Sequence, residues 1–179
     1  TALLPGTILR GQTSVGKNCT IGPNSYLENA RVGDGTKVNA SQVYNSSIGY
    51  DTHVGPFAYI RPGSSVGNCV RVGDFVEIKN SAIGDGTKIS HLTYVGDSDV
   101  GKNINFGCGT VTVNYDRAKK YRTVIEDNAF IGCNTNLIAP VRVGEGAYIA
   151  AGSTITDDIP AMALSIARAR QQNKKDWAS

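Results

Sequence analysis

The 179-residue chain is poor in aromatic residues, in histidine and in charge of either sign. Aromatic residues make up 7% of the chain, and the two histidines are too few for a three-histidine zinc site. The net charge is only +3, and no run of lysine and arginine favours a nucleic-acid partner. No apolar run approaches the ~18 residues of a membrane span, so we expect no membrane partner either.

The cysteines exclude two further classes of protein. They occur at 19, 69, 108 and 133 and form no C-x-x-C pair, which argues against a zinc ribbon and against a small disulfide scaffold. Without a recognisable signal peptide, four free thiols indicate the reducing cytoplasm. The chain begins without methionine, in the middle of the pattern described next, so we expect a piece of a longer protein.

What the chain has in abundance is glycine, with 21 residues, and aliphatic side chains at intervals of six. Neither a helix nor an alternating strand has this period. It predicts short strands joined by tight turns, three to a coil of about 18 residues, with coils stacked roughly 4.8 Å apart. We therefore predict an all-β parallel β-helix of hexapeptide repeats, in which about 155 residues form eight or nine coils. The period is unbroken at Ile125, Ile131, Leu137, Val143, Ile149 and Ile155, and it persists with some steps of five from Leu3 to Phe106.

Two segments leave the pattern. Residues 114–122, "NYDRAKKYR", are polar and aromatic and predict a loop that extends from the coil, where functional residues are often placed. After Pro160 the alanine-rich stretch "AMALSIARARQQNKKDW" predicts a short helix or a tail. We expect a β-helix over 1–159 and a C-terminal helix or tail over 160–179.

Stacking brings residues 18 apart in sequence onto the same face. Arg61 and Lys79 are 18 apart in a stretch of regular steps, and two stacked cations repel unless an anion lies between them or carboxylates flank them. A phosphate is the natural anion. The alternative is a solvated basic pair with Glu77 nearby.

His91, in "SHLTYVGD", is the candidate base. We expect Asp74 one coil below it, Cys108 one coil above it, and its imidazole on a wall shared with Arg61 and Lys79. Neutral imidazole accepts protons near pH 7, although a lone histidine also suits a purely structural role. His53 is interpreted as structural or as a surface residue.

Cys133 and Ala151 predict a second column, made of small residues. They are also 18 apart, and small side chains there would leave the backbone open to a ligand. The same small residues could equally well be selected by the fit of a turn.

Five segments of the chain carry a family resemblance. They read "GPFAYIRPGSSVGN", "VGDFVEIKNSAIGDGTKISHLTYVGDSDVG", "NFGCGTVTVNYD", "FIGCNTNLIAPVRVGEGAYIAAGSTIT" and "ALSIARARQ". Together they resemble the C-terminal acetyltransferase domain of the bacterial bifunctional N-acetylglucosamine-1-phosphate uridyltransferase and glucosamine-1-phosphate N-acetyltransferase. The resemblance implies a left-handed β-helix and a homotrimer with active sites between subunits. It also implies acetyl transfer from acetyl-CoA to glucosamine 1-phosphate, for UDP-N-acetylglucosamine, peptidoglycan and lipopolysaccharide synthesis.

The same resemblance implies roles for individual residues. His91 would be the catalytic base, without a metal. The sugar phosphate would be bound by Arg61, Lys79, Tyr94 and Asn105, with Glu77 in support. Acetyl-CoA would be bound by Cys108, Asn114, Tyr115, Cys133, Ala151 and Arg168, the last from the C-terminal segment.

The uridyltransferase half of that family is not expected in this chain. No "GxGTRM"-like loop and no alternating strand–helix pattern occurs, so neither UDP-sugar synthesis nor the Mg²⁺ it needs is expected here. Three residues depart from the family pattern. Arg117 follows "NYD" where glycine is common, and Cys108 and Cys133 replace alanine and serine.

Two alternative functions remain. A hexapeptide acyltransferase of the same fold could act on another amine, or the coil could be a trimerisation module without chemistry of its own. An enzyme is favoured, since a pure scaffold does not need the row of Arg61, Lys79, His91, Asn105, Asn114 and Tyr115.

Overall fold

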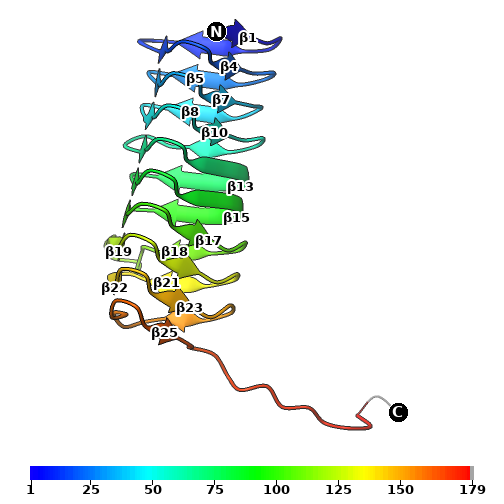
Figure 1. The fold of residues 1–179 in the computed structure, drawn as a ribbon, viewed down its shortest axis with the longest axis vertical. Helices are drawn as coiled ribbons and strands as arrows, with labels where there is room; N and C mark the ends of the chain where they lie inside the picture. The colour runs from blue at the N-terminus through cyan, green and yellow to red at the C-terminus, as the bar shows by residue number, and fades with distance from the viewer. Residues whose placement is uncertain (178–179) are drawn as a thin grey trace.

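The computed structural model describes residues 1–177, which form a single stack of coils (Figure 1). It contains 25 short strands, all paired in parallel, and about 10 turns. The predicted all-β solenoid is confirmed, and its left-handed sense stays a prediction. Residues 1–177 contain no helix, so none of them forms a helix that could cross a bilayer.

Each coil has three faces, which we call A, B and C in chain order. Face A contains β1 (Ala2–Leu3), β4 (Thr20–Ile21), β7 (Lys37–Val38), β10 (His53–Val54), the first part of β13 (Arg71–Lys79), the first part of β15 (Lys88–Gly96), β17 (Asn105–Phe106), β20 (Phe130–Ile131), β23 (Tyr148–Ile149) and β25 (Leu164–Ser165).

Face B follows face A around a corner and includes the second parts of β13 and β15. Its other strands are β2 (Ile8–Arg10), β5 (Tyr26–Glu28), β8 (Gln42–Tyr44), β11 (Tyr59–Ile60), β18 (Val111–Val113), β21 (Asn136–Ile138) and β24 (Thr154–Ile155).

Face C closes the triangle. It consists of β3 (Ser14–Val15), β6 (Arg31–Val32), β9 (Ser47–Ile48), β12 (Ser65–Val66), β14 (Ala82–Ile83), β16 (Ser98–Val100), β19 (Thr123–Ile125) and β22 (Val141–Val143).

Coil length explains why the turns outnumber the predicted eight or nine. Val38 pairs with Val54 at a spacing of 16, and Ile21 pairs with Val38 at a spacing of 17. Ile60 pairs with Ile78 at the full spacing of 18. The steps of five in the sequence therefore shorten several coils without breaking the register.

The core is a thin column of the aliphatic side chains that mark the period. Ile21, Leu27, Ile60, Ile89 and Leu137 are all 0% exposed. Burial fails at the open N-terminal end, where Leu3 is 56% exposed and Leu9 is 38% exposed because no preceding coil covers them in the structure. Burying a leucine side chain contributes about 1.5–3 kcal/mol, so the interior coils supply most of the stability.

The corners require close backbone approach. A Cβ added to Gly84 would lie 2.5 Å from the carbonyl carbon and oxygen of Gly101 in the next coil, a distance that no side chain can accept. Asparagine occupies many other corner positions with positive φ, including Asn80 at 46° and Asn134 at 54°. Asparagine tolerates this left-handed conformation better than most residues.

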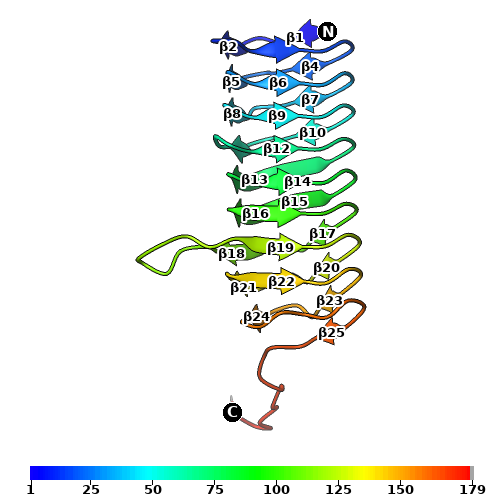
Figure 2. The ribbon, with the colours of Figure 1, turned by 90° about the vertical axis from the view of Figure 1, so that its left-hand side faces the viewer.

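The predicted loop at 114–122 is confirmed. It leaves the coil between β18 and β19 as a long hairpin (Figure 2), with an antiparallel bridge between Tyr115 and Lys120. The coil resumes in register beyond it, since Phe106 pairs with Ile131.

The predicted C-terminal segment is a tail, and the helix offered as its alternative is wrong. Leu164 and Ser165 form β25, and the chain then runs away from the stack (Figure 1). Ile166 is 60% exposed and Trp177 is 80% exposed, so no buried apolar face stabilises a helix here. Of the predicted range 160–179, residues 178–179 lie outside the described residues.

We predict that a leucine-to-alanine substitution lowers the free energy of unfolding more inside the stack than at its N-terminal end. Leu137→Ala removes a fully buried side chain and should lower the free energy of unfolding by about 2–5 kcal/mol. Leu3→Ala, at the equivalent period position but 56% exposed, should cost under about 1 kcal/mol. Urea unfolding followed by circular dichroism measures both, and equal losses would contradict the described end of the core.

Candidate functional site

His91 lies at the corner between faces A and B. In the register of β13 with β15 it pairs with Asp74, and its Nδ1 is 2.8 Å from Asp74 Oδ1. The His91 side chain is 60% exposed, so the rest of its ring is open to solvent. The hydrogen bond with His91 and one from the Asp74 backbone hold the pKa of the Asp74 carboxyl below its usual value.

The corner below and above His91 is a continuous column. The pairings of Ile89 with Phe106 and of Phe106 with Ile131 place Cys108 over His91 and Cys133 over Cys108. The amide of Asn134 donates to the Cys108 carbonyl oxygen at 2.8 Å, and the amide of Gly152 donates to the Cys133 carbonyl oxygen at 2.7 Å.

Ala151 completes this column beyond Cys133, because Ile131 pairs with Ile149. Cys108 and Cys133 are exposed free thiols. The Arg168 side chain passes beside the same corner, with its Cδ 3.6 Å from the position of a Cβ on Gly152. The predicted stacking is therefore confirmed, and Arg168 lies next to the small residues.

The predicted cation pair lies at the far edge of face B, at the corner with face C. The pairing of Ile60 with Ile78 places Arg61 beside Lys79. Arg61 Nη1 contacts Glu77 Oε1 at 2.7 Å, and Lys79 Nζ contacts Asp97 Oδ2 at 3.2 Å. Carboxylates thus flank both cations, which was one of the two expected ways to relieve their repulsion.

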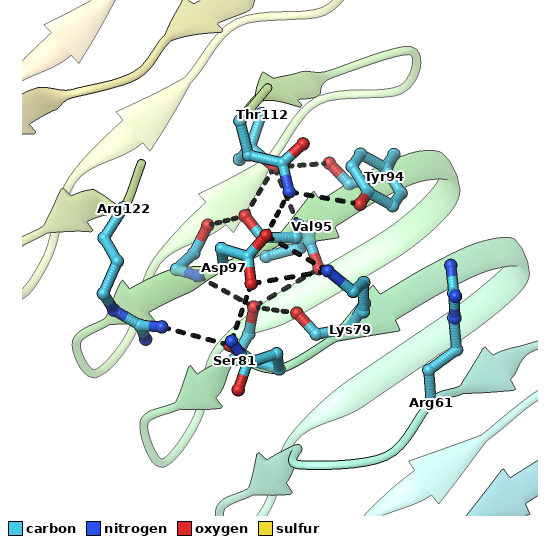
Figure 3. Close-up of polar contacts among 12 residues, drawn as sticks. Arg61, Lys79, Ser81, Tyr94, Val95, Asp97, Thr112 and Arg122 are labelled. Carbon is cyan, nitrogen blue, oxygen red and sulfur yellow. Dashed lines mark hydrogen bonds and ion pairs between the residues drawn. The ribbon is translucent and has the colours of Figure 1, made fainter. Parts of the chain in front are cut away.

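Asp97 is the buried centre of this edge, and sequence reasoning missed it. Its side chain is 6% exposed and points at the Lys79 ammonium (Figure 3). It accepts a hydrogen bond from Asn80 Nδ2 at 2.6 Å and another from Asn114 Nδ2. Burial acts to raise the pKa of Asp97, but these two amides and Lys79 outweigh it, and the pKa lies below its usual value.

The hairpin adds a third cation. The neighbouring Lys79 lowers the pKa of Lys120, because two ammonium groups so close together repel, and Arg61 adds to the repulsion. Arg61, Lys79 and Lys120 therefore converge with only Glu77 and Asp97 as counter-charges, which leaves an excess of positive charge. Such a cluster suits an anion with several acceptor oxygens. Lys120 was also missed, because the coil register does not extend into a loop.

Polar contacts hold the hairpin where its second strand rejoins the coil and at its tip. Arg122 donates to both oxygens of Asp99, at 2.8 and 2.6 Å. Asp116 Oδ1 accepts the amides of Ala118 and Lys119, which closes the tip. Arg117, the residue that departs from the family pattern, has a φ of 83°, in the region that favours glycine.

The remaining predicted residues lie on face B, on face A and on the hairpin. Tyr94 lies on face B, stacked on Glu77, and its hydroxyl accepts a hydrogen bond from Asn114 at 3.4 Å. Asn105 lies on face A, and the Tyr115 side chain is 56% exposed on the hairpin. His53 is exposed on face A, as a surface histidine.

One expectation needs correction: His91 does not share its position on the wall with Arg61 and Lys79. Lys79 pairs with Gly96, which is five residues after His91 along β15. At about 3.3 Å per residue, the backbone of His91 lies roughly 15 Å from the backbone of the two cations, at the opposite edge of face B.

Face B is hollowed between these two edges. The depression has a volume of about 350 Å³ and is lined mainly by Phe75, Glu77, Leu92, Tyr94 and Val111. Residues 1–177 contain no group of three or more His, Cys, Asp or Glu side chains placed to hold a metal ion.

The ion pair of Asp97 generates a prediction about acid stability. Asp97→Asn leaves the mostly buried Lys79 without its partner and should cost about 1–3 kcal/mol of unfolding free energy at pH 7. Because the folded-state pKa is lowered, the wild-type advantage is complete above about pH 4 and declines as the pH falls through the folded value. Urea unfolding at pH 7 and pH 3 measures this.

The matched control is Asp99→Asn, because Asp99 and its partner Arg122 are 52% and 42% exposed. It should cost under about 1 kcal/mol at pH 7. An Asp97→Asn penalty that is the same at both pH values would contradict the ionic origin of the effect.

Comparison with known proteins agrees with this architecture. Residues 122–157 match the family described as bacterial transferase hexapeptide (six repeats), and residues 12–40 match the hexapeptide repeat of succinyl-transferase. UDP-N-acetylglucosamine acyltransferase from Campylobacter jejuni superimposes with a TM-score of 0.65, covering 90% of this chain and 70% of that chain at 18% identity. At this identity the likeness supports the fold alone.

Two curated relatives are far more similar in sequence. The bifunctional protein GlmU of Geobacillus sp. (strain WCH70) is 58% identical over 177 residues, 99% of this chain and 39% of the relative. GlmU of Acetivibrio thermocellus is 60% identical over 99% of this chain and 38% of the relative. The chain thus spans under two-fifths of the length of these relatives. By these matches the chain is similar to the C-terminal part of bifunctional GlmU proteins, and two of its segments carry hexapeptide repeats of transferase families.

Proposed function

We propose that this chain transfers an acetyl group from acetyl-CoA to the amine of glucosamine 1-phosphate, giving N-acetylglucosamine 1-phosphate. The proposal rests first on the 58–60% identity to GlmU proteins over almost the whole chain. The product would feed UDP-N-acetylglucosamine synthesis and thus the cell envelope. Four thiols with no disulfide among the described residues fit a cytoplasmic enzyme.

The observation that carries the proposal is the exposed His91, held by Asp74 at 2.8 Å. An amine attacks a thioester only when it is unprotonated, so a proton acceptor is needed as the new bond to the carbonyl carbon forms. An imidazole can accept that proton directly near neutral pH. Direct attack requires no covalent acyl-enzyme, and Cys108 above His91 need not act as a nucleophile.

The three converging cations account for the phosphate of the acceptor. Arg61 supplies a planar fork of donors, and Lys79 and Lys120 supply point charges. Tyr94 and Glu77 line the depression beside them and would contact the sugar, and Asn105 would complete the sugar site from face A. The 350 Å³ volume suits a ligand of this size.

Acetyl-CoA would lie along the column of small residues. Cys108, Cys133 and Ala151 form the corner above His91, and a cofactor bound along them would have its thioester near the proposed base. Arg168, from the tail at 160–179, would contact the anionic part of the cofactor. Asn114 and Tyr115 would approach from the hairpin.

The separation of the two edges supports assembly into a homotrimer. Within one protomer the backbone of the proposed base and that of the cations lie roughly 15 Å apart, at opposite edges of face B, because Gly96 beside Lys79 is five residues after His91. Packing the edge of one protomer against the hairpin and face of another would bring a second set of these groups to the same depression. The active site would then lie between subunits.

Removing the base should abolish most of the activity. His91→Ala should lower kcat by about 10²–10⁴-fold, because the amine proton then has no positioned acceptor. Thiol release from acetyl-CoA in the presence of glucosamine 1-phosphate measures the rate. His53→Ala, at an exposed site on face A, is the matched control and should keep the wild-type rate. An unchanged kcat for His91→Ala would remove the basis of the assignment.

The phosphate role predicts a selective change in KM. Arg61→Ala should raise the KM for glucosamine 1-phosphate by about 10-fold or more, and should change the KM for acetyl-CoA little. The same assay with unphosphorylated glucosamine tests the role of the anion, because Arg61→Ala should hardly affect that poorer substrate. Equal effects on both KM values, or activity that prefers an unrelated amine, would contradict the proposed substrate.

A further inference from the structure

The contact between Asp74 and His91 indicates which nitrogen of the imidazole carries the proton. The lowered pKa of Asp74 means that its carboxylate is ionised at neutral pH. An ionised carboxylate has no proton and can only accept hydrogen bonds. The 2.8 Å contact is a hydrogen bond only if Nδ1 of His91 carries the proton. In the neutral imidazole, Nε2 is then the atom with the free lone pair.

The backbone fixes the two side chains relative to each other. β13 and β15 stay in register on both sides of the pair, with Val72 opposite Ile89 and Val76 opposite Thr93. The Thr93 hydroxyl donates to the His91 carbonyl oxygen at 2.7 Å and anchors the corner just after the imidazole. Asp74 therefore approaches the ring from a defined direction, one coil below.

We propose that Asp74 is a positioning residue that holds His91 in the Nδ1–H tautomer and turns the Nε2 lone pair toward the acceptor amine. This inference rests on the proposed function for its catalytic meaning, but the tautomer itself is a property of the protein alone. Nothing in the family resemblance assigned a role to Asp74.

The proton balance follows from this tautomer. As the amine nitrogen bonds to the thioester carbonyl carbon, one of its protons passes to Nε2, and His91 becomes an imidazolium beside the Asp74 carboxylate. When the carbon–sulfur bond breaks, the Nε2 proton can neutralise the departing thiolate of coenzyme A. His91 returns to the Nδ1–H form, and no proton or electron is left over.

The tautomer can be observed directly. Long-range ¹H–¹⁵N spectra of ¹⁵N-histidine-labelled protein distinguish a protonated Nδ1 from a protonated Nε2, and His53→Gln assigns the two signals because the chain has only two histidines. Neutral His91 should show the Nδ1–H pattern in the wild type, and that preference should be lost in Asp74→Ala. An Nε2–H pattern for wild-type His91 would overturn the inference.

Steady-state kinetics test whether Asp74 supports catalysis by His91. Asp74→Asn should lower kcat by about 10–10³-fold while both KM values stay within about two-fold, and Asp74→Glu should recover part of the rate. Asp51→Asn changes an exposed aspartate at another corner of the stack, so it is the control and should change neither rate nor tautomer. An unchanged kcat in Asp74→Asn would overturn the positioning role.

The two proposals fail separately. Full activity in His91→Ala would refute the catalytic base and leave the tautomer result untouched. Loss of activity in His91→Ala with an Nε2–H tautomer in the wild type would keep the base and refute the role of Asp74.

Discussion

The structure depends on parallel backbone hydrogen bonds between successive coils. Each strand donates to the coil on one side and accepts from the coil on the other, so residues 16 to 18 apart in sequence lie side by side everywhere except across the hairpin. This constraint places aliphatic side chains in one column in the core and polar side chains in matching columns outside. Every group of functional residues here is a consequence of that repetition.

The candidate site residues lie in two groups, one at each edge of face B. One corner carries Asp74, His91, Cys108, Cys133 and Ala151 in consecutive coils, so the proposed base and the small residues lie in one column. The other edge of face B carries the cations and the buried Asp97, which the hairpin reaches through Asn114 and Lys120. The depression lies between these two edges, on face B.

The period was enough to predict the strands, the core, the loop and the stacking of Arg61 on Lys79, because regular steps make sequence distance a measure of spatial distance. It was not enough to predict the partners that lie outside the six-residue period, Asp97 and Lys120. Asp97 follows Gly96, the register partner of Lys79, and this could have been found by continuing the 17-residue spacing of that coil. Lys120 could not, because a hairpin has no register. The tail was ambiguous, since alanine-rich sequence favours a helix only where an apolar face is buried.

The hairpin also shows how such a scaffold tolerates change. Phe106 and Ile131 occupy adjacent rungs although 25 residues separate them, the same arrangement that 17 or 18 residues produce elsewhere. The pitch of the stack is thus insensitive to an insertion at this corner. The length and charge of this hairpin can therefore change in evolution while the spacing of the coils stays the same.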